Sequence, residues 1–323
     1  MSALPSIQIE SIQTVRQDAN HNAFTDLCRY DGRFYLAFRS CPDGHTFAGT
    51  SRIVVLSSDD GKDWSEAFTF GVQGRDSRDP QFLIFKETLF VYTGTWLMPE
   101  TGQPISLNNN VGYGAWTEDG SNWDGPHLLE GTYGHFIWRA AAYGDRAYLC
   151  ARRRRSFQAG IEREEEPESI EAAMLESFDG RVWQFRTFFT EDHGCETAFL
   201  FEPDGSVLGF AREDAGQRAR VLRSAPPYEE WTRVFLDRNV GGPVLARWGD
   251  HYLVAGRKRS EAGASTVLYW LAEDQLHEVI ELPSGGDCSY PGFVETDDGG
   301  GLLSYYSSHE GSTSIYLAEF SLQ

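Results

Sequence analysis

The chain has 323 residues, of which 41% are hydrophobic and 24% charged, a composition that suits a folded protein with a large core and excludes a disordered chain. Its formal net charge of −20 means that long-range electrostatics oppose nucleic acid and anionic membrane surfaces. We therefore expect neither nucleic acid nor membrane as a partner.

The five cysteines are widely spaced and form no C-x-x-C pair, which argues against a disulfide framework or a zinc site. The first residues lack a basic region followed by an apolar one, and no apolar run reaches membrane-spanning length. These features predict a cytoplasmic protein, or a secreted one if a leader was trimmed away.

In chain order, residues 7–15 alternate apolar and polar side chains, which predicts a β-strand. Six turn motifs follow, each between two apolar arms and separated by roughly 45 to 60 residues, the spacing of propeller blades. The turns lie at Asp31-Gly32, Glu87-Thr88, Gly144-Asp145, Asp204-Gly205, Gly249-Asp250 and Asp298-Gly299.

A third apolar run and a fourth, separated by a turn containing Gly and Trp, follow most of these hairpins. The pattern predicts an all-β, six-bladed β-propeller of four-stranded antiparallel blades, formed by residues 1–323 as a single domain. The last copy ends after its third strand, at residues 315–320, so we expect the N-terminal strand to complete the sixth blade.

The turn before the first blade's fourth strand has a regular motif: Ser57, Asp59, Gly61 and Trp64 fit the spacing S-x-D-x-G-x-x-W. The motif resembles the Asp-box (BNR) repeat of sialidase-like propellers, and residues 117–123 and 177–183 are weaker copies. We expect the Asp59 carboxylate to accept backbone N–H groups, a structural role.

Long connections after second strands and before first strands mark one face of the propeller as functional. The run of arginines at residues 152–155 belongs to such a connection, and the acidic tract at residues 162–168 neutralises it in part. The residues predicted to point into this face are Asp26, Arg39, Arg78, Asp79, Arg139, Arg152, Glu196, Arg212, Arg257, Tyr290 and Tyr306.

Four of these positions resemble the functional residues of the sialidase (neuraminidase) superfamily in order and separation: Glu196, Arg212, Arg257 and Tyr290. The resemblance implies that Tyr290 is a nucleophile, that Glu196 takes its proton, and that the two arginines bind a substrate carboxylate. A tyrosine, with a pKa of about 10, needs such a base to act at neutral pH. The function implied is an exo-acting, retaining glycoside hydrolase whose partner is a carbohydrate.

The chain departs from the sialidase pattern where the family has an arginine at the start of blade one, because Asp26 stands there. Arg39 or Arg78 could replace that arginine, and a terminal sugar other than ordinary sialic acid, acidic sugars included, is the expected substrate. The family's general acid would fall near Asp43 or His45, and a histidine is a suitable acid near neutral pH.

A second resemblance leads to a different mechanism. Residues Ser77-Arg78-Asp79-Pro80 are similar to the Arg-Asp-Pro motif of five-bladed fructan and arabinan hydrolases, whose carboxylate trio would here be Asp26, Asp79 and Glu196. The same residues also suit a carbohydrate-binding propeller without catalysis, or a lyase acting on uronates.

Beyond the catalytic candidates, we expect substrate to be bound by a set of cationic and aromatic residues: Arg39, His45, Arg78, Arg139, Arg212, Arg257 and Tyr306. Three further histidines, His21, His135 and His309, fall on the same face, but none is grouped with other ligands at a metal-binding spacing. The sequence therefore predicts no metal and no cofactor, and it leaves the oligomeric state open.

Overall fold

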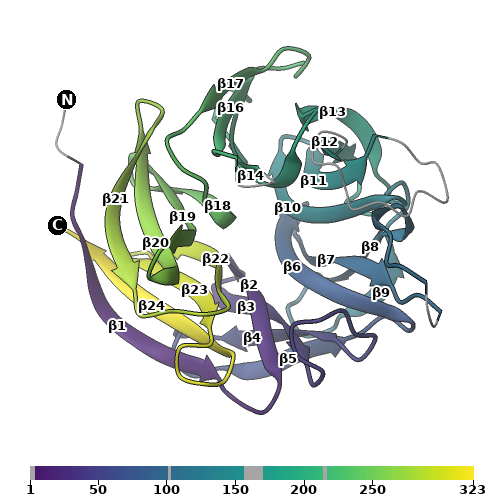
Figure 1. The fold of residues 1–323 in the computed structure, drawn as a ribbon, viewed down its shortest axis with the longest axis horizontal. Coiled ribbons are helices and arrows are strands. Elements are labelled where there is room, and N and C mark those ends of the chain that lie inside the picture. The colour runs from purple at the N-terminus through teal and green to yellow at the C-terminus, as the bar shows by residue number, and fades with distance from the viewer. Residues whose placement is uncertain (1–3, 101–102, 156–169, 214–216) are drawn as a thin grey trace.

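The computed structural model describes residues 4–100, 103–155, 170–213 and 217–323, and it shows six four-stranded antiparallel sheets arranged around a central axis (Figure 1). The predicted all-β, six-bladed propeller is therefore confirmed. Within the described residues, the helical content is a single 3-10 turn, η1 (Leu107–Asn109), and no helix is long and apolar enough to span a membrane. The predicted acidic tract at residues 162–168 lies outside the described residues.

Each blade takes four strands, and the first strand of each is the innermost, in contact with the first strands of its neighbours. Blade one contains β2 (His21–Tyr30), β3 (Arg33–Cys41), β4 (Arg52–Ser58) and β5 (Ser65–Phe70). Blade two contains β6 (Arg75–Phe85), β7 (Thr88–Leu97), β8 (Val111–Thr117) and β9 (Asp124–Leu128). Blade three contains β10 (His135–Tyr143), β11 (Arg146–Arg154), β12 (Ile170–Ser177) and β13 (Gln184–Thr190).

The second half of the ring repeats this order. Blade four contains β14 (Gly194–Phe201), β15 (Val207–Glu213), β16 (Arg220–Ser224) and β17 (Thr232–Phe235). Blade five contains β18 (Gly241–Trp248), β19 (His251–Ser260), β20 (Gly263–Ala272) and β21 (Gln275–Leu282). Blade six contains β22 (Cys288–Glu295), β23 (Gly301–Ser307), β24 (Ser314–Leu322) and β1 (Ile7–Arg16).

The sixth blade is closed by the N-terminal strand, as predicted. β1 runs antiparallel to β24 on the outer edge of the blade, with Ile7 opposite Leu322. The indole nitrogen of Trp270, in blade five, donates a 2.8 Å hydrogen bond to the carbonyl of Pro5. The first and last strands are thus paired with each other, and β1 covers the edge that β24 would otherwise expose.

The turns between third and fourth strands of blades one, two and three share one hydrogen-bonding pattern, but the prediction that Asp59 accepts the backbone N–H groups is wrong. The carboxylate of Asp60 accepts from the backbone nitrogens of Lys62 and Asp63, at 2.8 and 3.0 Å, and Ser58 accepts from Gly61. Asp59 instead pairs with Arg33 at the surface. The predicted motif was one residue out of register. The turn contains two consecutive serines followed by two consecutive aspartates, residues 57–60, so a Ser-x-Asp spacing can begin at either serine.

Every inner hairpin carries a β-bulge at the same place. At each bulge the first strand advances by three residues while the second strand advances by two, so the first strand carries one extra residue. The six bulges lie between Ala23 and Asp26, Arg78 and Gln81, Ile137 and Ala140, Gly194 and Thr197, Gly241 and Val244, and Ser289 and Gly292. A bulge bends the strand and redirects the side chains of the extra residue and its neighbours. The six bulges form a ring at one end of the central axis.

Candidate active site

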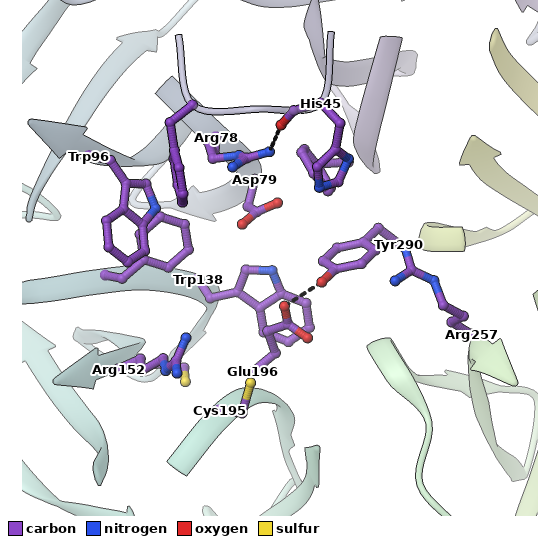
Figure 2. A pocket seen from close by; sticks show the side chains of 14 residues that line it. His45, Arg78, Asp79, Trp96, Trp138, Arg152, Cys195, Glu196, Arg257 and Tyr290 are labelled. Carbon is purple, nitrogen blue, oxygen red and sulfur yellow. Dashed lines mark hydrogen bonds between the residues drawn. The ribbon is translucent and has the colours of Figure 1, made fainter. Parts of the chain in front are cut away.

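A pocket with a cavity volume of about 190 Å³ opens at the ring of bulges (Figure 2). Five of the six bulges contribute a lining side chain, and the other lining residues lie in the connection that follows β3 and in strands β7, β10, β11 and β19. The lining residues are Phe24, His45, Phe47, Arg78, Asp79, Trp96, Phe136, Trp138, Cys150, Arg152, Cys195, Glu196, Arg257 and Tyr290.

Glu196 and Tyr290 meet at the base of this pocket. The tyrosine hydroxyl donates a 2.5 Å hydrogen bond to one carboxylate oxygen of Glu196. Arg212 donates to the other oxygen at 2.5 Å and to the tyrosine hydroxyl at 3.1 Å. The hairpin from β14 to β15 places Glu196 and Arg212 side by side, and β22 brings Tyr290 across from blade six.

The surroundings of this cluster fix its protonation. Burial acts to raise the pKa of Glu196, but the charge of Arg212 and the hydrogen bond from Tyr290 hold that pKa below its ordinary value. Burial and the neighbouring Glu196 charge raise the pKa of Tyr290 well above its usual range. The pair therefore holds one proton, on the phenol, with the carboxylate positioned to receive it.

Gly242 completes the cluster from blade five. Its backbone nitrogen donates a 3.1 Å hydrogen bond to Glu196, and its φ of 56° lies in the left-handed region that glycine adopts freely. A Cβ atom built on Gly242 would lie 2.5 Å from the ring of Tyr290. Glycine is therefore required both for the backbone conformation and for the close approach of the tyrosine.

Asp79 faces the same pocket from the bulge of blade two. Burial and the nearby charge of Glu196 raise the pKa of Asp79 to about 7, although Arg78 and Arg39 oppose the shift. One of its oxygens, Oδ1, is buried and has no hydrogen-bond partner among the described residues. A carboxyl group with this pKa can hold a proton near neutral pH and donate it.

Aromatic side chains form the wall between blades one, two and three. The rings of Phe47 and Trp96 lie 5.0 Å apart, and those of Trp96 and Phe136 lie 5.5 Å apart. Trp138, at the bulge of β10, is buried, and its indole nitrogen has no hydrogen-bond partner within the described chain. Arg78 lies between the faces of Phe24 and Phe47, at 5.1 and 4.9 Å from their centroids.

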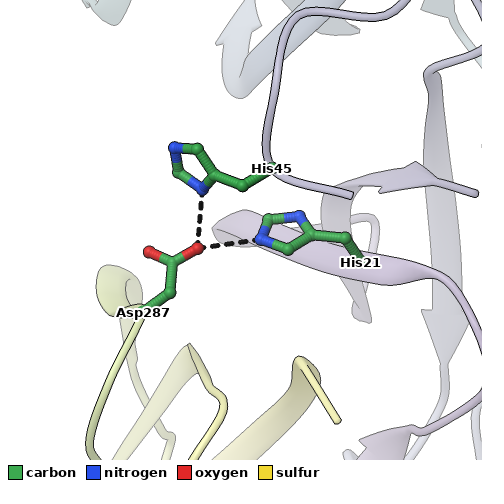
Figure 3. Close-up of side chains that lie close together, drawn as sticks. All are labelled: His21, His45 and Asp287. Atoms are coloured by element: carbon green, nitrogen blue, oxygen red, sulfur yellow. Dashed lines mark hydrogen bonds and ion pairs between the residues drawn. The ribbon is translucent and has the colours of Figure 1, made fainter. Parts of the chain in front are cut away.

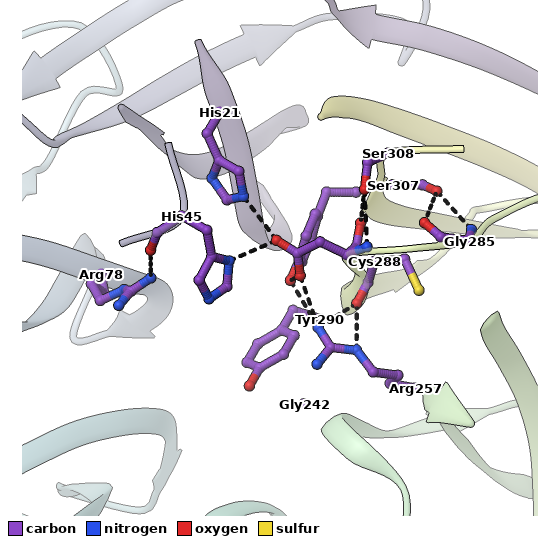
Figure 4. Close-up of polar contacts among 12 residues, drawn as sticks. His21, His45, Arg78, Gly242, Arg257, Gly285, Cys288, Tyr290, Ser307 and Ser308 are labelled. Carbon is purple, nitrogen blue, oxygen red and sulfur yellow. Dashed lines mark hydrogen bonds and ion pairs between the residues drawn. The ribbon is translucent and has the colours of Figure 1, made fainter. Parts of the chain in front are cut away.

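A second polar cluster at the rim centres on Asp287, immediately before β22 (Figure 4). One of its oxygens accepts hydrogen bonds from Tyr306 at 2.8 Å and from Arg257 at 3.4 Å. The other contacts His21 at 2.8 Å and His45 at 2.6 Å. Burial acts to raise the pKa of Asp287, but the hydrogen bonds from the two histidines hold it far below its usual range.

Arg257 is held by its own surroundings. Besides Asp287, it donates to the carbonyl of Cys288, at 2.8 Å from Nε and 2.6 Å from Nη2, and to the hydroxyl of Tyr306 at 2.8 Å. A carboxylate of the protein therefore stands beside the arginine that was expected to bind a carboxylate of the substrate. Arg212, the other expected member, is engaged with Glu196 and Tyr290.

The structure does not bring all of the predicted site residues into the pocket. Asp26 accepts from Arg139 at 2.6 Å and from the backbone nitrogen of Phe82 at 2.7 Å, so both expected site residues form a buried ion pair instead. Neither lines the pocket. The bulges account for this: they present Phe24 in place of Asp26, and Trp138 in place of Arg139.

Four further candidates are not part of the pocket lining: Arg39, Asp43, Tyr306 and Arg212, the last of which contacts the lining residues Glu196 and Tyr290. Arg39 is fully buried, pairs with Asp76 at 3.1 Å, and donates to the carbonyls of two residues in the connection that follows β3. Asp43, in that connection, is exposed and accepts a 2.5 Å hydrogen bond from Thr50. Tyr306 is buried behind the rim and contacts Asp287.

The histidines are distributed differently from the expectation. His135 is buried, and burial lowers its pKa to about 4, so it is neutral at physiological pH. His309 bonds to Ser307, two residues away. His21 and His45, which lie on separate elements of blade one, meet at Asp287 of blade six. Sequence reasoning missed Asp287 because it precedes a strand and belongs to no motif.

Among known proteins, solved structures resemble this chain, and the resemblance is one of fold. No family model matches the sequence, and no curated protein matches it either. A Dyadobacter fermentans protein of unknown function superposes with a TM-score of 0.82 at 21% identity, over 99% of this chain and 100% of that one.

Two sialidases share the same architecture. A Trypanosoma rangeli sialidase in complex with the inhibitor DANA superposes with a TM-score of 0.69 at 12% identity, over 97% of this chain and 58% of the sialidase. A Hadza microbial sialidase superposes with a TM-score of 0.67 at 13% identity, over 93% of this chain and 65% of the sialidase. This chain therefore spans less than two thirds of either sialidase, and the likeness is one of fold.

Proposed function

We propose that the protein is an exo-acting, retaining glycoside hydrolase in which Tyr290 is the nucleophile and Glu196 its base. The observation that carries the proposal is the 2.5 Å hydrogen bond from the phenol to a carboxylate that is kept ionised at the base of a pocket. The tyrosine oxygen attacks the anomeric carbon while its proton passes to Glu196, and a glycosyl-enzyme bond forms.

Asp79 is the proton donor in this proposal. As the glycosidic bond breaks, the leaving oxygen takes the proton of Asp79, whose pKa of about 7 suits a general acid at neutral pH. In the second step Asp79 takes a proton from water, the water oxygen attacks the anomeric carbon, and Tyr290 leaves as it takes back its proton from Glu196. The sialidase resemblance placed the acid near Asp43 or His45; Asp43 does not line the pocket, and His45, which does, is engaged with Asp287.

The sugar that we propose is a terminal residue other than an ordinary sialoside. A substrate carboxylate at Arg257 would have to compete with Asp287, which is already bound there. The aromatic wall of Phe47, Trp96 and Phe136 offers flat apolar surface to a sugar ring. The unpartnered atoms of Asp79 and Trp138 are available to sugar hydroxyls.

A mechanism with three catalytic carboxylates has less support. Asp26 is bound by Arg139 and by a backbone nitrogen, so it offers no oxygen to the pocket. Glu196 faces Tyr290 instead. The uronate lyase and the carbohydrate-binding propeller without catalysis remain as outcomes of the experiment.

The test is a screen of neutral and acidic aryl glycosides with the wild-type protein, Tyr290→Phe and Tyr252→Phe. Tyr252 is a matched control because its hydroxyl also bonds a glutamate, Glu202, at 2.7 Å, outside the pocket. Loss of the nucleophile should lower kcat/KM by roughly 10³-fold or more, while the control stays near wild type.

Hydrolysis that survives unchanged in Tyr290→Phe would refute the tyrosine mechanism. Saturable glycan binding without turnover would instead favour the binding propeller, and an unsaturated product absorbing in the ultraviolet would favour a lyase.

A further inference from the structure

We propose that the rim cluster of His21, His45 and Asp287 is a binding site for a divalent transition-metal ion of the zinc type. Each residue offers one ligand atom, and the three atoms lie within 4.8 Å of one another (Figure 3). They are Nε2 of His21, Nδ1 of His45 and an oxygen of Asp287. The inference is independent of the glycosidase proposal, since metal binding is measured without a sugar.

The chemistry of the donors selects the ion. Two imidazole nitrogens and one carboxylate oxygen are the ligand set of open zinc sites and of some iron(II) sites, whereas Ca²⁺ and Mg²⁺ take oxygen ligands. Both imidazoles point at the same oxygen, Asp287 Oδ2, at 2.8 and 2.6 Å. Three lone pairs can converge on one point when each neutral imidazole carries its proton on the ring nitrogen that faces away from Asp287.

The cluster needs a small rearrangement to hold an ion: the carboxylate oxygen must move away from both imidazole nitrogens, which themselves lie within 4.8 Å of each other. Bonds of about 2.0 Å in a tetrahedral zinc site separate the ligand atoms by roughly 3.3 Å, less than 1 Å beyond the hydrogen-bonded distances. His45 can supply this movement because its side chain is 54% exposed and lies on a connection, whereas the His21 side chain is only 8% exposed on β2.

Outer contacts hold the carboxylate in place. Tyr306 and Arg257 both bind Oδ1 of Asp287, which leaves Oδ2 directed at the two histidines (Figure 4). Ser308 donates to the carbonyl of Asp287 and accepts from its backbone nitrogen. Such supporting contacts orient metal ligands and tune their affinity, and here they keep the cationic Arg257 on the oxygen that the ion would not use.

The site adjoins the pocket. His45 lines the pocket and belongs to the cluster, so a coordination position left open by three protein ligands would be within reach of a bound water or ligand hydroxyl. The described residues offer one comparison pair, His127 and Asp124, which are 2.7 Å apart at the surface without a third ligand in their group.

Isothermal titration of Zn²⁺ into the untagged, metal-stripped protein tests the proposal, with His45→Ala and His21→Ala as variants and His127→Ala as the matched control. We expect one site per chain in the wild type and in the control, and an affinity at least about 100-fold weaker in both variants.

His45→Ala keeps the test decisive if His21→Ala fails to fold, because His45 is exposed. Equal Zn²⁺ affinity in the wild type and His45→Ala, or loss of the site in His127→Ala, would overturn the proposal. Binding of Mg²⁺ as tight as that of Zn²⁺ would also overturn it. A Co²⁺ derivative whose visible absorption bands vanish in His45→Ala would support it.

Discussion

At the scale of single residues, the pocket depends on side chains in an uncommon backbone conformation. Phe24, Asp79 and Tyr290 all have φ between 50° and 59°, a left-handed region that L-residues other than glycine rarely adopt. Each lies at a bulge of an inner strand, and each lines the pocket. Backbone strain of this kind is concentrated at functional sites, where it aims a side chain.

Asp79 gives a prediction in which the direction of the pH effect is defined. If its pKa is about 7 in the folded chain and 3.8 in the unfolded one, folding favours the protonated form, and stability is lost as pH rises through that interval. Asp79→Asn should therefore be more stable than the wild type at pH 8, by up to a few kcal/mol, and about equal to it near pH 4. Urea unfolding at both pH values measures this.

The same substitution separates the catalytic role from the structural one. If Asp79 is the general acid, kcat/KM of the wild type should fall above about pH 7, and Asp79→Asn should lower activity by roughly 10²- to 10⁴-fold. Asp43→Asn is the control and should keep the wild-type pH profile. An alkaline limb that persists in Asp79→Asn, or disappears in Asp43→Asn, would assign the acid elsewhere.

At the scale of strands and turns, the repeated turn between third and fourth strands is held by a serine or threonine and an aspartate two residues later. Ser177 and Asp179 repeat the contacts of Ser58 and Asp60: Asp179 accepts backbone bonds of 2.8 and 3.0 Å. Thr117 and Asp119 form the third copy. The backbone N–H groups of each turn are thus satisfied locally rather than by a neighbouring strand.

Two adjacent aspartates allow a direct test of this register. Asp60→Ala removes the acceptor of two backbone hydrogen bonds and should lower the melting temperature by roughly 2 to 4 °C. Asp59→Ala removes only an exposed pair with Arg33 and should leave the melting temperature nearly unchanged. Calorimetry of the two variants measures the melting temperatures. Equal decreases, or a larger decrease in Asp59→Ala, would contradict the assignment of Asp60 as the acceptor of the backbone N–H groups.

Sequence patterns predicted most of the elements but only part of the site. Alternating apolar arms and Gly-containing turns indicated the hairpins, and the hairpin from Glu196 to Arg212 formed as expected. Their position near the starts of first strands, however, placed Asp26 and Arg139 in the pocket, because a bulge leaves no local sequence signal and reverses the faces beyond it. Asp287 escaped notice because its partners come from blades one, five and six.

At the scale of the whole molecule, stability depends on joining the first strand of the chain to the last blade. β1 pairs with β24 along its length, and its apolar residues Ile7, Ile9 and Ile12 pack against the core between blades five and six. The edge of β24 is covered only while this strand is in place. The contact joins residues far apart in sequence, so its closure entropy is large.

Deletion of residues 2–16 should therefore expose the edge of β24 and yield a protein that self-associates and unfolds less cooperatively. Addition of a synthetic peptide of residues 5–16 should restore the monomer-like elution and part of the lost melting temperature. Size-exclusion chromatography and calorimetry, each with and without peptide, provide the measurement. A truncated chain that elutes and melts like the full chain would show that the closure contributes little.

The ring of six bulges has a consequence for engineering. Because each bulge inserts a single residue and the ladder resumes its pairing beyond it, the bulge side chains can be exchanged without shifting the strands. The propeller therefore offers five exchangeable positions around one axis, occupied here by Phe24, Asp79, Trp138, Glu196 and Tyr290, whereas Gly242 at the sixth bulge is fixed by its backbone conformation and by the ring of Tyr290. A combinatorial library of substitutions confined to these positions would vary the chemistry of the pocket while the propeller scaffold stays constant.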